Sequence, residues 1–503
     1  MRASRPSETE AGASTSRPAE EMQSGERPIE SKRAQAGSRI PLVVDLDGTL
    51  VSSDLMLESV FVLAKHQPLR ALGLPLWLAN GWAQFKHRLA MTARPDARTL
   101  PYNREFVDYL REQKKFGRPL VLATAADEAI ARDVAQEVGL FDAVYASDGA
   151  ENLSGERKRE RLVSEFGIGG FDYAGDSDRD RTIWHAARKA ILVGRARGAE
   201  ADGVKVERAF RDGGGRTGAF AEALRIDHWL KNALVFPPLI AAHRLYEIVP
   251  LLHGIAAFVA FCLCASSVYL LNDLIDLPQD RLHPHKKHRP LASGRVSTRW
   301  AVTAMPLLLL GAFAAGLTQS PALLGVLGLY YLLMVGYCLR LREVIVLDVL
   351  TLAMGYALRV IAGAVASSLA VEHWLVLSCA LFFLGLALLK RYAELAATRL
   401  AGGAEVHARA YPARDGRAVA IFGCLSGYLA VAVYAYHTRL DYALNDRHAL
   451  VWLVFPLLLY WLTHIWLLAH RGKIFNDPVT FALADRRSQV VGLLAVAAIL
   501  ASA

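Results

Sequence analysis

The 503-residue sequence predicts two fold classes joined end to end: an α/β domain with a parallel sheet, then an all-α bundle of about nine membrane-spanning helices. Three observations support this. Short apolar runs alternate with helical patterns over residues 41–197. Long apolar segments fill residues 222–503, and Lys and Arg concentrate in every second loop between them.

The composition excludes several classes of protein. Hydrophobic residues make up 53% of the chain and charged residues 21%, which argues against one soluble globule, a disordered chain or a fibrous repeat. The net charge of +9 fits either nucleic-acid binding or basic loops of a membrane protein. We favour the membrane and expect no nucleic-acid partner, because the basic residues are not clustered with stacking aromatics. The five cysteines all lie in apolar stretches, so no disulfide framework is expected.

The N-terminal half begins with residues 1–40, which are rich in Ser, Glu, Arg, Gly and Pro and predict a disordered tail without a signal peptide. Five apolar runs then read as buried strands: Ile40–Leu46, Leu120–Ala123, Ala143–Ala146, Phe171–Ala174 and Ala190–Val193. Four helical patterns separate them: Asn103–Phe116, Glu128–Gly139, Lys158–Phe166 and Asp178–Arg188. Strands alternating with helices predict a parallel α/β sheet.

Residues 51–100 form an apolar helical insertion that contains Trp77 and Trp82. It fits either a lid over a site at the sheet edge or a segment that rests on the bilayer.

Residues 198–221 are predicted to be a linker, because they are rich in glycine. The candidate spans that follow lie near residues 230–243, 248–271, 299–317, 321–339, 344–369, 373–389, 418–437, 449–469 and 489–503. Alternate loops hold 18 Lys and Arg on one side and 3 on the other. This asymmetry places the basic loops and the α/β domain in the cytoplasm, at the cell (inner) membrane.

Four segments of the α/β half hold polar residues that follow or flank the predicted strands. Asp45 and Asp47 follow the first strand, and two carboxylates in that position suit both Mg²⁺ and phosphoryl transfer. Thr124 and Lys158 come later in the chain, followed by the acidic run Gly175-Asp176-Ser177-Asp178-Arg179-Asp180.

These segments resemble, in order and setting, the haloacid-dehalogenase (HAD) phosphatase superfamily over residues 41–194. The resemblance implies that Asp45 is the nucleophile and Asp47 the general acid and base, and that Thr124 and Lys158 hold phosphate. It also implies a Mg²⁺ site that Asp45, Asp47, Asp176 and Asp180 form or support. A domain that keeps these residues but acts only as a scaffold is the alternative.

The loop after the second span carries a second constellation. Asp273, Asp276 and Asp280 follow one another at i, i+3 and i+7, which places them along one helix face. Three like charges repel one another unless divalent cations lie between them, bridging to a diphosphate. Lys286 and Arg289 add positive charge for phosphate oxygens.

This motif resembles the first Asp-rich signature of the UbiA superfamily of intramembrane prenyltransferases. The run from Asp280 to Pro290 looks like the branch that uses phosphoribosyl pyrophosphate (PRPP), the decaprenyl-phosphate phosphoribosyltransferases. By that resemblance the catalytic and metal residues are Asp273, Asp276 and Asp280, and the substrate-binding residues are Lys231, Asn232, Asn272, Lys286, Arg289, Tyr337, Arg342, Lys390 and Arg391. Arg342 stands where the branch usually has lysine, and a second Asp-rich motif after the sixth span is missing.

The resemblance implies a Mg²⁺-dependent transfer of phosphoribose from PRPP to a polyprenyl phosphate, followed by phosphate removal in the HAD-like domain. The expected partners are a polyprenyl phosphate or diphosphate, the bilayer and a phosphorylated small molecule. One alternative is transfer of a polyprenyl group from its diphosphate to an aromatic acceptor. Another is a HAD phosphatase whose helical half is only an anchor. A transporter would leave the three carboxylates beside a basic loop without a role.

Overall fold

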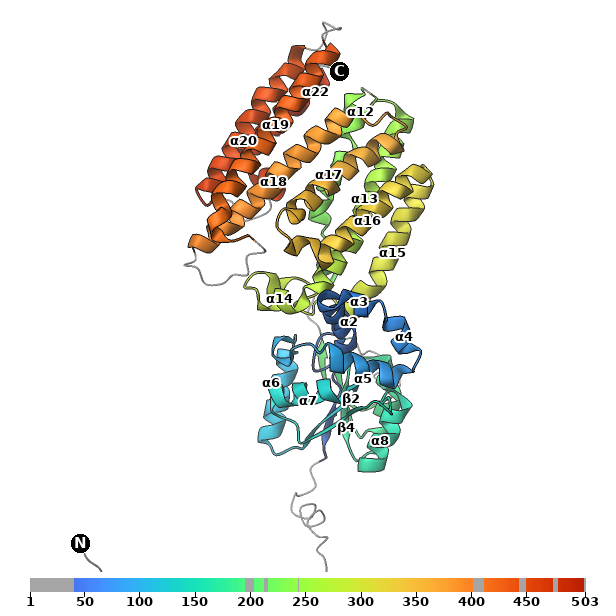
Figure 1. Ribbon diagram of the computed structural model, residues 1–503. Helices are drawn as coiled ribbons and strands as arrows, with labels where there is room; N and C mark the ends of the chain where they lie inside the picture. Colours follow the sequence, from blue (N-terminus) through green and yellow to red (C-terminus); the bar gives the residue numbers. More distant parts are fainter. Residues whose placement is uncertain are drawn as a thin grey trace, which may run out of the picture. The chain divides into compact units, whose positions relative to one another are not determined.

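The computed structural model describes residues 40–194, 203–211, 216–242, 244–400, 411–442, 449–473 and 478–501. The predicted tail therefore lies almost wholly outside the described residues. Both predicted classes of structure are present: strands occur in the first part of the chain, and long helices make up the second (Figure 1).

The α/β part is built on a six-stranded parallel sheet in the order β3-β2-β1-β4-β5-β6. The strands are β1 (Leu42–Val44), β2 (Leu120–Asp127), β3 (Ala143–Ser147), β4 (Asp172–Gly175), β5 (Ala190–Gly194) and β6 (Val206–Arg211). All five predicted strands are found. A sixth strand, β6, lies inside the predicted linker; it pairs with β5 in parallel, with a register shift between Ala190 and Ile191, and its Phe210 is buried.

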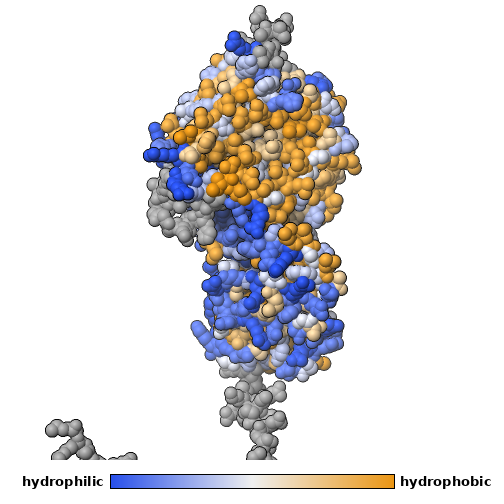
Figure 2. Space-filling view, in the orientation of Figure 1, coloured by the Kyte–Doolittle hydropathy of each residue, from blue (hydrophilic) through white to orange (hydrophobic). Residues whose placement is uncertain are grey.

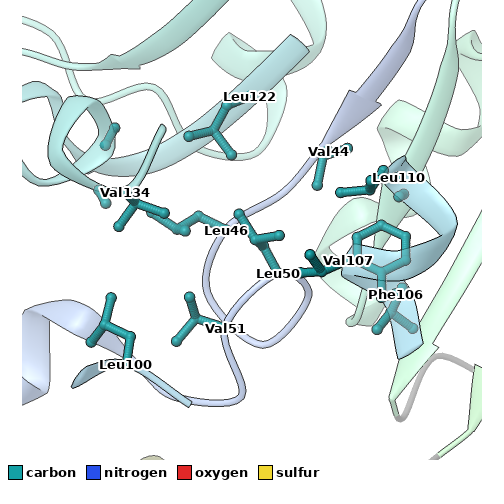
Figure 3. Packing of buried hydrophobic residues seen from close by; sticks show 14 of the residues in the cluster. Val44, Leu46, Leu50, Val51, Leu100, Phe106, Val107, Leu110, Leu122 and Val134 are labelled. Atoms are coloured by element: carbon teal, nitrogen blue, oxygen red, sulfur yellow. The ribbon is translucent and has the colours of Figure 1, made fainter. Parts of the chain in front are cut away.

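Helices on both faces bury the apolar sides of the strands. Their bounds are α6 (Arg104–Lys115), α7 (Glu128–Val138), α8 (Glu156–Phe166) and α9 (Arg181–Ala186). On one face Val44 and Leu122 pack with Phe106, Leu110 and Val134 (Figure 3). The sheet is thus a rigid frame, and the loops at the carboxyl ends of β1, β2 and β4 are held at fixed positions relative to one another.

The insertion between β1 and α6 folds into short helices. They are α2 (Leu55–His66), α3 (Pro68–Ala71), α4 (Leu74–Leu78), α5 (Trp82–Thr92) and the 3₁₀ turn η1 (Ala97–Thr99). Leu63 of α2 and Phe85 and Leu89 of α5 form a small core of their own. Asp54 caps α2 by accepting a hydrogen bond from the backbone N–H of Leu57.

The second part is helical. Its long helices are α13 (Ile248–Ile275), α15 (Thr298–Leu317), α16 (Pro321–Leu339), α17 (Leu347–Ala366), α18 (His373–Leu400), α19 (Gly416–Tyr442) and α20 (Val454–His470). In the described part of the chain, seven helices are long and apolar enough to cross a membrane, and they correspond to the second to eighth predicted spans. Figure 2 shows the largely hydrophobic surface of the helical part. Leu307, Leu310 and Leu332 are among the exposed apolar residues of its helices.

The first and last predicted spans, near 230–243 and 489–503, are the shortest of the nine, and neither forms one of the long helices. Residues 226–241 form the 3₁₀ segment η3 (Ile226–Val235) and then α12 (Pro237–Ala241), because Pro237 and Pro238 cannot continue the hydrogen-bond ladder of a preceding helix. The last span is α22 (Arg486–Ala501), of 16 residues.

The remaining elements are short. They are α11 (Arg216–Ala223), α14 (Leu277–Leu282), η4 (Lys286–His288), η5 (Leu341–Glu343), η6 (Ala413–Asp415), η7 (Ala449–Leu453), α21 (Pro478–Ala484) and η2 (Asp178–Asp180). Of these, α14 and η4 form the basic loop after α13, and η5 leads into α17.

Candidate functional sites

The carboxyl ends of β1 and β4 bring three carboxylates together. Oxygens of Asp45, Asp176 and Asp180 all lie within 4.8 Å of one another. This follows from the register, in which β1 and β4 are parallel neighbours and end at the same sheet edge. Carboxylate oxygens at this spacing suit a hard divalent cation such as Mg²⁺.

Gly48 makes the close approach of these loops feasible. A Cβ atom at Gly48 would lie 2.2 Å from Oδ2 of Asp176, and the backbone there has φ = +85°. Only glycine satisfies both conditions. The side chain of Asp47 is directed differently: its Oδ1 accepts a hydrogen bond of 3.0 Å from the backbone N–H of Leu55 in α2. Asp47 is thus outside the carboxylate triad and stands at the start of the insertion.

Lys158 supplies the positive charge of this site. Its Nζ donates hydrogen bonds of 2.8 Å to Asp45 and of 2.8 Å to the hydroxyl of Tyr173, which in turn donates to Asp180 at 2.9 Å. Thr124 is buried within β2, and its Oγ1 accepts from the backbone N–H of Ala126. Asp45, Lys158, Asp176 and Asp180 are thus gathered at one end of the sheet.

Burial of so many acids in one place changes their protonation. Burial raises the pKa of Asp176 to about 7, and the charges of Asp45 and Asp180 add to the effect. Burial likewise raises the pKa of Asp47 to about 8. Burial lowers the pKa of Lys158, but Asp45 and Asp180 outweigh it and keep the ammonium charged. Repulsion between the carboxylates favours their protonated forms. A cation bound among them would favour the charged forms, so that the protons would be released.

Helix α5 of the insertion adds residues that the sequence patterns did not single out. Lys86 donates to the backbone oxygen of Ala125 at 2.7 Å and to Oδ1 of Asn152 at 2.8 Å. Beside it lies a cavity of about 550 Å³, whose lining includes Trp82, Asn152 and Arg157. Lys86 is far from the acidic motifs in sequence and is an isolated lysine in an amphipathic helix. No sequence pattern therefore marks it as a site residue.

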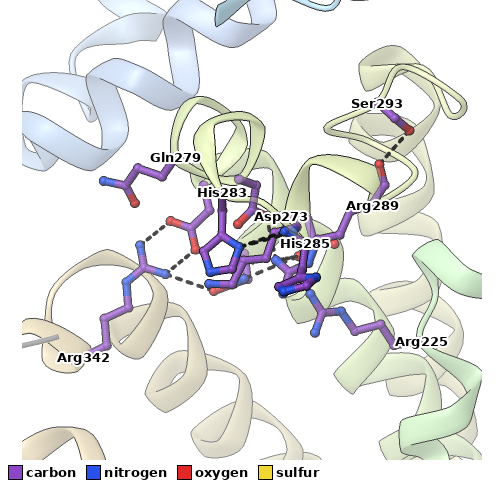
Figure 4. Close-up of polar contacts among 12 residues, drawn as sticks. Arg225, Asp273, Gln279, His283, His285, Arg289, Ser293 and Arg342 are labelled. Carbon is purple, nitrogen blue, oxygen red and sulfur yellow. Dashed lines mark hydrogen bonds and ion pairs between the residues drawn. The ribbon is translucent and has the colours of Figure 1, made fainter. Parts of the chain in front are cut away.

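The helical part has its polar centre where α13 ends. Figure 4 shows Arg225, Arg289 and Arg342 approaching the acidic residues from different elements. Asp273 is paired with Arg225, and Nη1 of Arg289 lies 3.3 Å from Asp273 and 2.6 Å from Asp280. All three carboxylates are buried. Burial raises the pKa of Asp280, and the positive charge of Arg289 partly offsets this rise.

Asp276 is held by a separate pair of cations. Arg342 donates two hydrogen bonds of 2.6 Å to its two oxygens, and Nζ of Lys65, from helix α2, lies 3.0 Å away. Burial would raise the pKa of Asp276, but these cations lower it. Arg342 also donates to Oδ1 of Asn272 at 3.1 Å. The carboxylates of the motif are thus paired with arginines and a lysine, and among the described residues they do not form a group spaced to share one ion.

Another predicted residue, Asn232, joins a network deeper in the bundle. Asn232 is buried in η3 and accepts a hydrogen bond of 2.7 Å from Arg359 of α17. Arg359 also donates to the hydroxyl of Tyr330 at 2.9 Å and to Gly355 O. The guanidinium of Arg359 is therefore hydrogen-bonded by three neutral groups within the helices. The neighbouring Lys231 is half-buried in the same 3₁₀ segment.

Tyr337 and Arg391 belong to a further cluster. Arg391 donates to Asp348 at 2.6 Å, to Glu394 at 2.6 Å and to the hydroxyl of Tyr337 at 3.2 Å. Tyr411 completes it by donating to Asp348 at 2.8 Å. Lys390 precedes Arg391 in α18 and is half-buried. Lys286 begins η4, where its positive charge lies near enough to Asp280 to influence that carboxylate.

Comparison with known proteins matches both parts. Residues 234–484 match the model of the UbiA prenyltransferase family, and residues 42–182 match haloacid dehalogenase-like hydrolases. The predicted boundaries of 41–197 and 222–503 enclose these matches.

Three relatives illustrate the range. A Sinorhizobium fredii protein without an assigned function is 34% identical over 92% of this chain and 90% of its own length. The nodulation protein NoeC of Azorhizobium caulinodans is 32% identical over 54% of this chain and 89% of its own. A decaprenyl-phosphate phosphoribosyltransferase of Mycobacterium tuberculosis is 29% identical over 55% of this chain and 92% of its own. With its long apolar helices and parallel sheet, the chain belongs to the UbiA prenyltransferase family and carries an N-terminal HAD-like domain.

Proposed function

We propose that the helical part transfers phosphoribose from PRPP to a polyprenyl phosphate at the cytoplasmic face of the inner membrane. The HAD-like domain then removes the 5-phosphate from the lipid product. The observation that carries the proposal is the charge pattern at the end of α13. Asp273, Asp276 and Asp280 lie among Arg225, Arg289, Arg342 and Lys65.

This pattern suits a magnesium diphosphate. Each carboxylate is paired with a cation, so the buried acids carry little unbalanced charge without substrate. When a diphosphate enters, the guanidinium groups can turn to its oxygens, and the carboxylates become available to Mg²⁺. Mg²⁺ would stabilise the departing diphosphate. The named activity of the mycobacterial relative supports PRPP as the donor.

The transfer step is a substitution at the anomeric carbon, C1, of PRPP. A phosphate oxygen of the lipid forms a bond to C1 while the bond from C1 to the diphosphate breaks. The arginines hold the diphosphate and so orient C1 towards the lipid. The exposed apolar surface of the helices offers the lipid chain a hydrocarbon environment.

The second step uses the carboxylates at the sheet edge. Asp45 attacks phosphorus and forms an aspartyl phosphate, while Asp47 gives a proton to the ribose 5-oxygen that leaves. A water activated by Asp47 then releases inorganic phosphate. Lys158 and Thr124 hold phosphate oxygens, and Mg²⁺ at Asp45, Asp176 and Asp180 would neutralise phosphate charge. The raised pKa of Asp47 keeps it protonated for its role as an acid.

The experiment incubates the purified full chain with Mg²⁺, a polyprenyl phosphate and PRPP, and follows lipids by mass spectrometry. The proposal expects a lipid-linked ribose without its 5-phosphate. Asp45→Asn should accumulate the phosphorylated lipid, and Asp273→Ala should form neither product.

Parallel reactions with a polyprenyl diphosphate and an aromatic acceptor test the alternative donor. Prenylated acceptor without lipid-linked ribose would replace the proposed transfer. Phosphatase activity that survives in Asp273→Ala, with no transfer by the unaltered chain, would leave the helical part as an anchor.

A further inference from the structure

Helix α2 of the HAD-like domain has two faces with different partners. Leu55 and Leu63 are buried inside the α/β part, in its main core and in the small core of the insertion. Asp54, Glu58, Phe61 and Lys65 follow one another at i, i+4, i+7 and i+11, which is the spacing of one helix face. All four of these residues contact the helical part.

The contacts of that face are specific. Arg299 donates to Asp54 at 2.7 Å, and Arg281 donates to Glu58 at 2.8 Å. Phe61 packs against two clusters of buried apolar residues in the helical part, to which α13 contributes. Arg281 and Glu58 are almost fully buried, with side-chain exposures of 5% and 1%. This buried ion pair joins α2 to α14, the short helix directly after α13.

Lys65 lies at the C-terminal end of this face and contacts the Asp-rich motif. Its Nζ donates to Asp276 at 3.0 Å and to Oε1 of Gln279 at 2.7 Å, and the side chain is only 8% exposed. Arg342 already occupies both oxygens of Asp276. A single carboxylate therefore receives two positive charges. Lys65 shares this carboxylate with Arg342, and a buried ammonium whose charge is balanced only in part is suited to receive an anionic ligand.

We infer that Lys65 is a diphosphate-binding residue of the transferase site, supplied by the HAD-like domain. The inference rests on the proposed function and adds a specific residue to it. Lys65 is paired with Asp276 in the free protein and donates to a diphosphate oxygen when Mg²⁺ and the donor bind. The two active sites then share one helix, since the N-terminal end of α2 donates to Asp47 and its C-terminal end carries Lys65.

The test compares the full chain with Lys65→Met, Lys65→Arg and Lys115→Met. Lys115 is an exposed lysine at the end of α6 and serves as the matched control. Inorganic diphosphate with Mg²⁺ is the first probe, titrated by calorimetry. Lys65→Met should weaken binding about tenfold or more, Lys65→Arg should recover most of it, and Lys115→Met should bind as the unaltered chain does.

The transfer reaction supplies the second measurement. Lys65→Met should raise KM for PRPP by a similar factor and change kcat less, while hydrolysis of a soluble phosphate ester at the HAD site stays within twofold. That hydrolysis also shows that the variant is folded.

The two measurements separate the inference from the proposed function. If the unaltered chain binds magnesium diphosphate but transfers no phosphoribose, the donor is wrong, and the affinity of Lys65→Met still decides the inference. Equal diphosphate affinity of Lys65→Met and the unaltered chain overturns the role of Lys65. No binding of diphosphate by the unaltered chain overturns both.

Discussion

Arg342 donates two hydrogen bonds of 2.6 Å to Asp276, one to each carboxylate oxygen. The planar guanidinium matches the carboxylate in a way that a single ammonium cannot. An arginine at this position therefore fixes the orientation of Asp276 more closely than a lysine would.

Arg342→Lys should therefore weaken the transferase site. One hydrogen bond to Asp276 is lost, and a charged hydrogen bond contributes roughly 1.5–3 kcal/mol. We expect KM for PRPP to rise about tenfold, as measured by lipid product formation at several donor concentrations. Arg340→Lys, at an exposed arginine paired with Glu343, should have no effect. Unchanged kinetics in Arg342→Lys would show that the paired geometry is not needed.

Gly48→Ala should disable the HAD site and leave the transferase site intact. The added methyl group would meet Asp176 at 2.2 Å, and the left-handed backbone adds roughly 1–2 kcal/mol of strain. Phosphate release from the lipid product should fall at least a hundredfold, while formation of the phosphorylated lipid continues. Gly218→Ala is the control, because a Cβ there meets nothing within 4 Å. Normal phosphate release by Gly48→Ala would mean that the loop relaxes freely.

Magnesium binding at the HAD site should strengthen as pH rises. The pKa of Asp176 is raised to about 7, so at pH 6 this carboxyl carries a proton that the metal must displace. Affinity should be about tenfold weaker at pH 6 than at pH 8. Calorimetry on an Asp273→Ala background isolates this site. An affinity that does not change with pH would contradict the assignment of Asp176.

The same shift has a consequence for stability. A carboxyl whose pKa is raised on folding stabilises the folded state less as pH climbs above its ordinary value near 4. Without magnesium the HAD-like domain should thus lose stability as pH rises from about 4 to 7. Added Mg²⁺ should restore it, and thermal unfolding in chelator and in excess Mg²⁺ measures the difference. Identical pH profiles in the two conditions would count against a metal at these carboxylates.

Glu58→Ala should destabilise the contact between α2 and the helical part. It leaves the buried guanidinium of Arg281 without its partner, which costs about 3–5 kcal/mol for a buried ion pair. Unfolding of the full chain in detergent should shift to lower temperature. The double variant Glu58→Ala with Arg281→Met should recover part of the loss, because no charge is then stranded. A double variant no better than Glu58→Ala alone would point to packing as the cause.

Much of the architecture follows from local patterns. Apolar runs ending in carboxylates predicted β1 and β4, because buried parallel strands need continuous apolar residues and polar ends. Hydrophobic length predicted the seven long helices. The same criterion overestimated the span before α13, where Pro237 and Pro238 interrupt the helix. It also missed β6, which is stabilised by its pairing with β5 rather than by a strong pattern of its own.

The sequence by itself determined that a HAD-like domain precedes a UbiA-family helical part, and which acidic residues are candidates for the two sites, since the spacing of Asp45 and Asp47, and of Asp273, Asp276 and Asp280, depends only on neighbours along the chain. The tertiary structure alone decided which cation meets each acid. Lys65 and Asp276 are 211 residues apart, and they meet because α2 buries one face in the α/β part and another against α13. Such a contact depends on how whole elements pack, and no local pattern of residues records that packing.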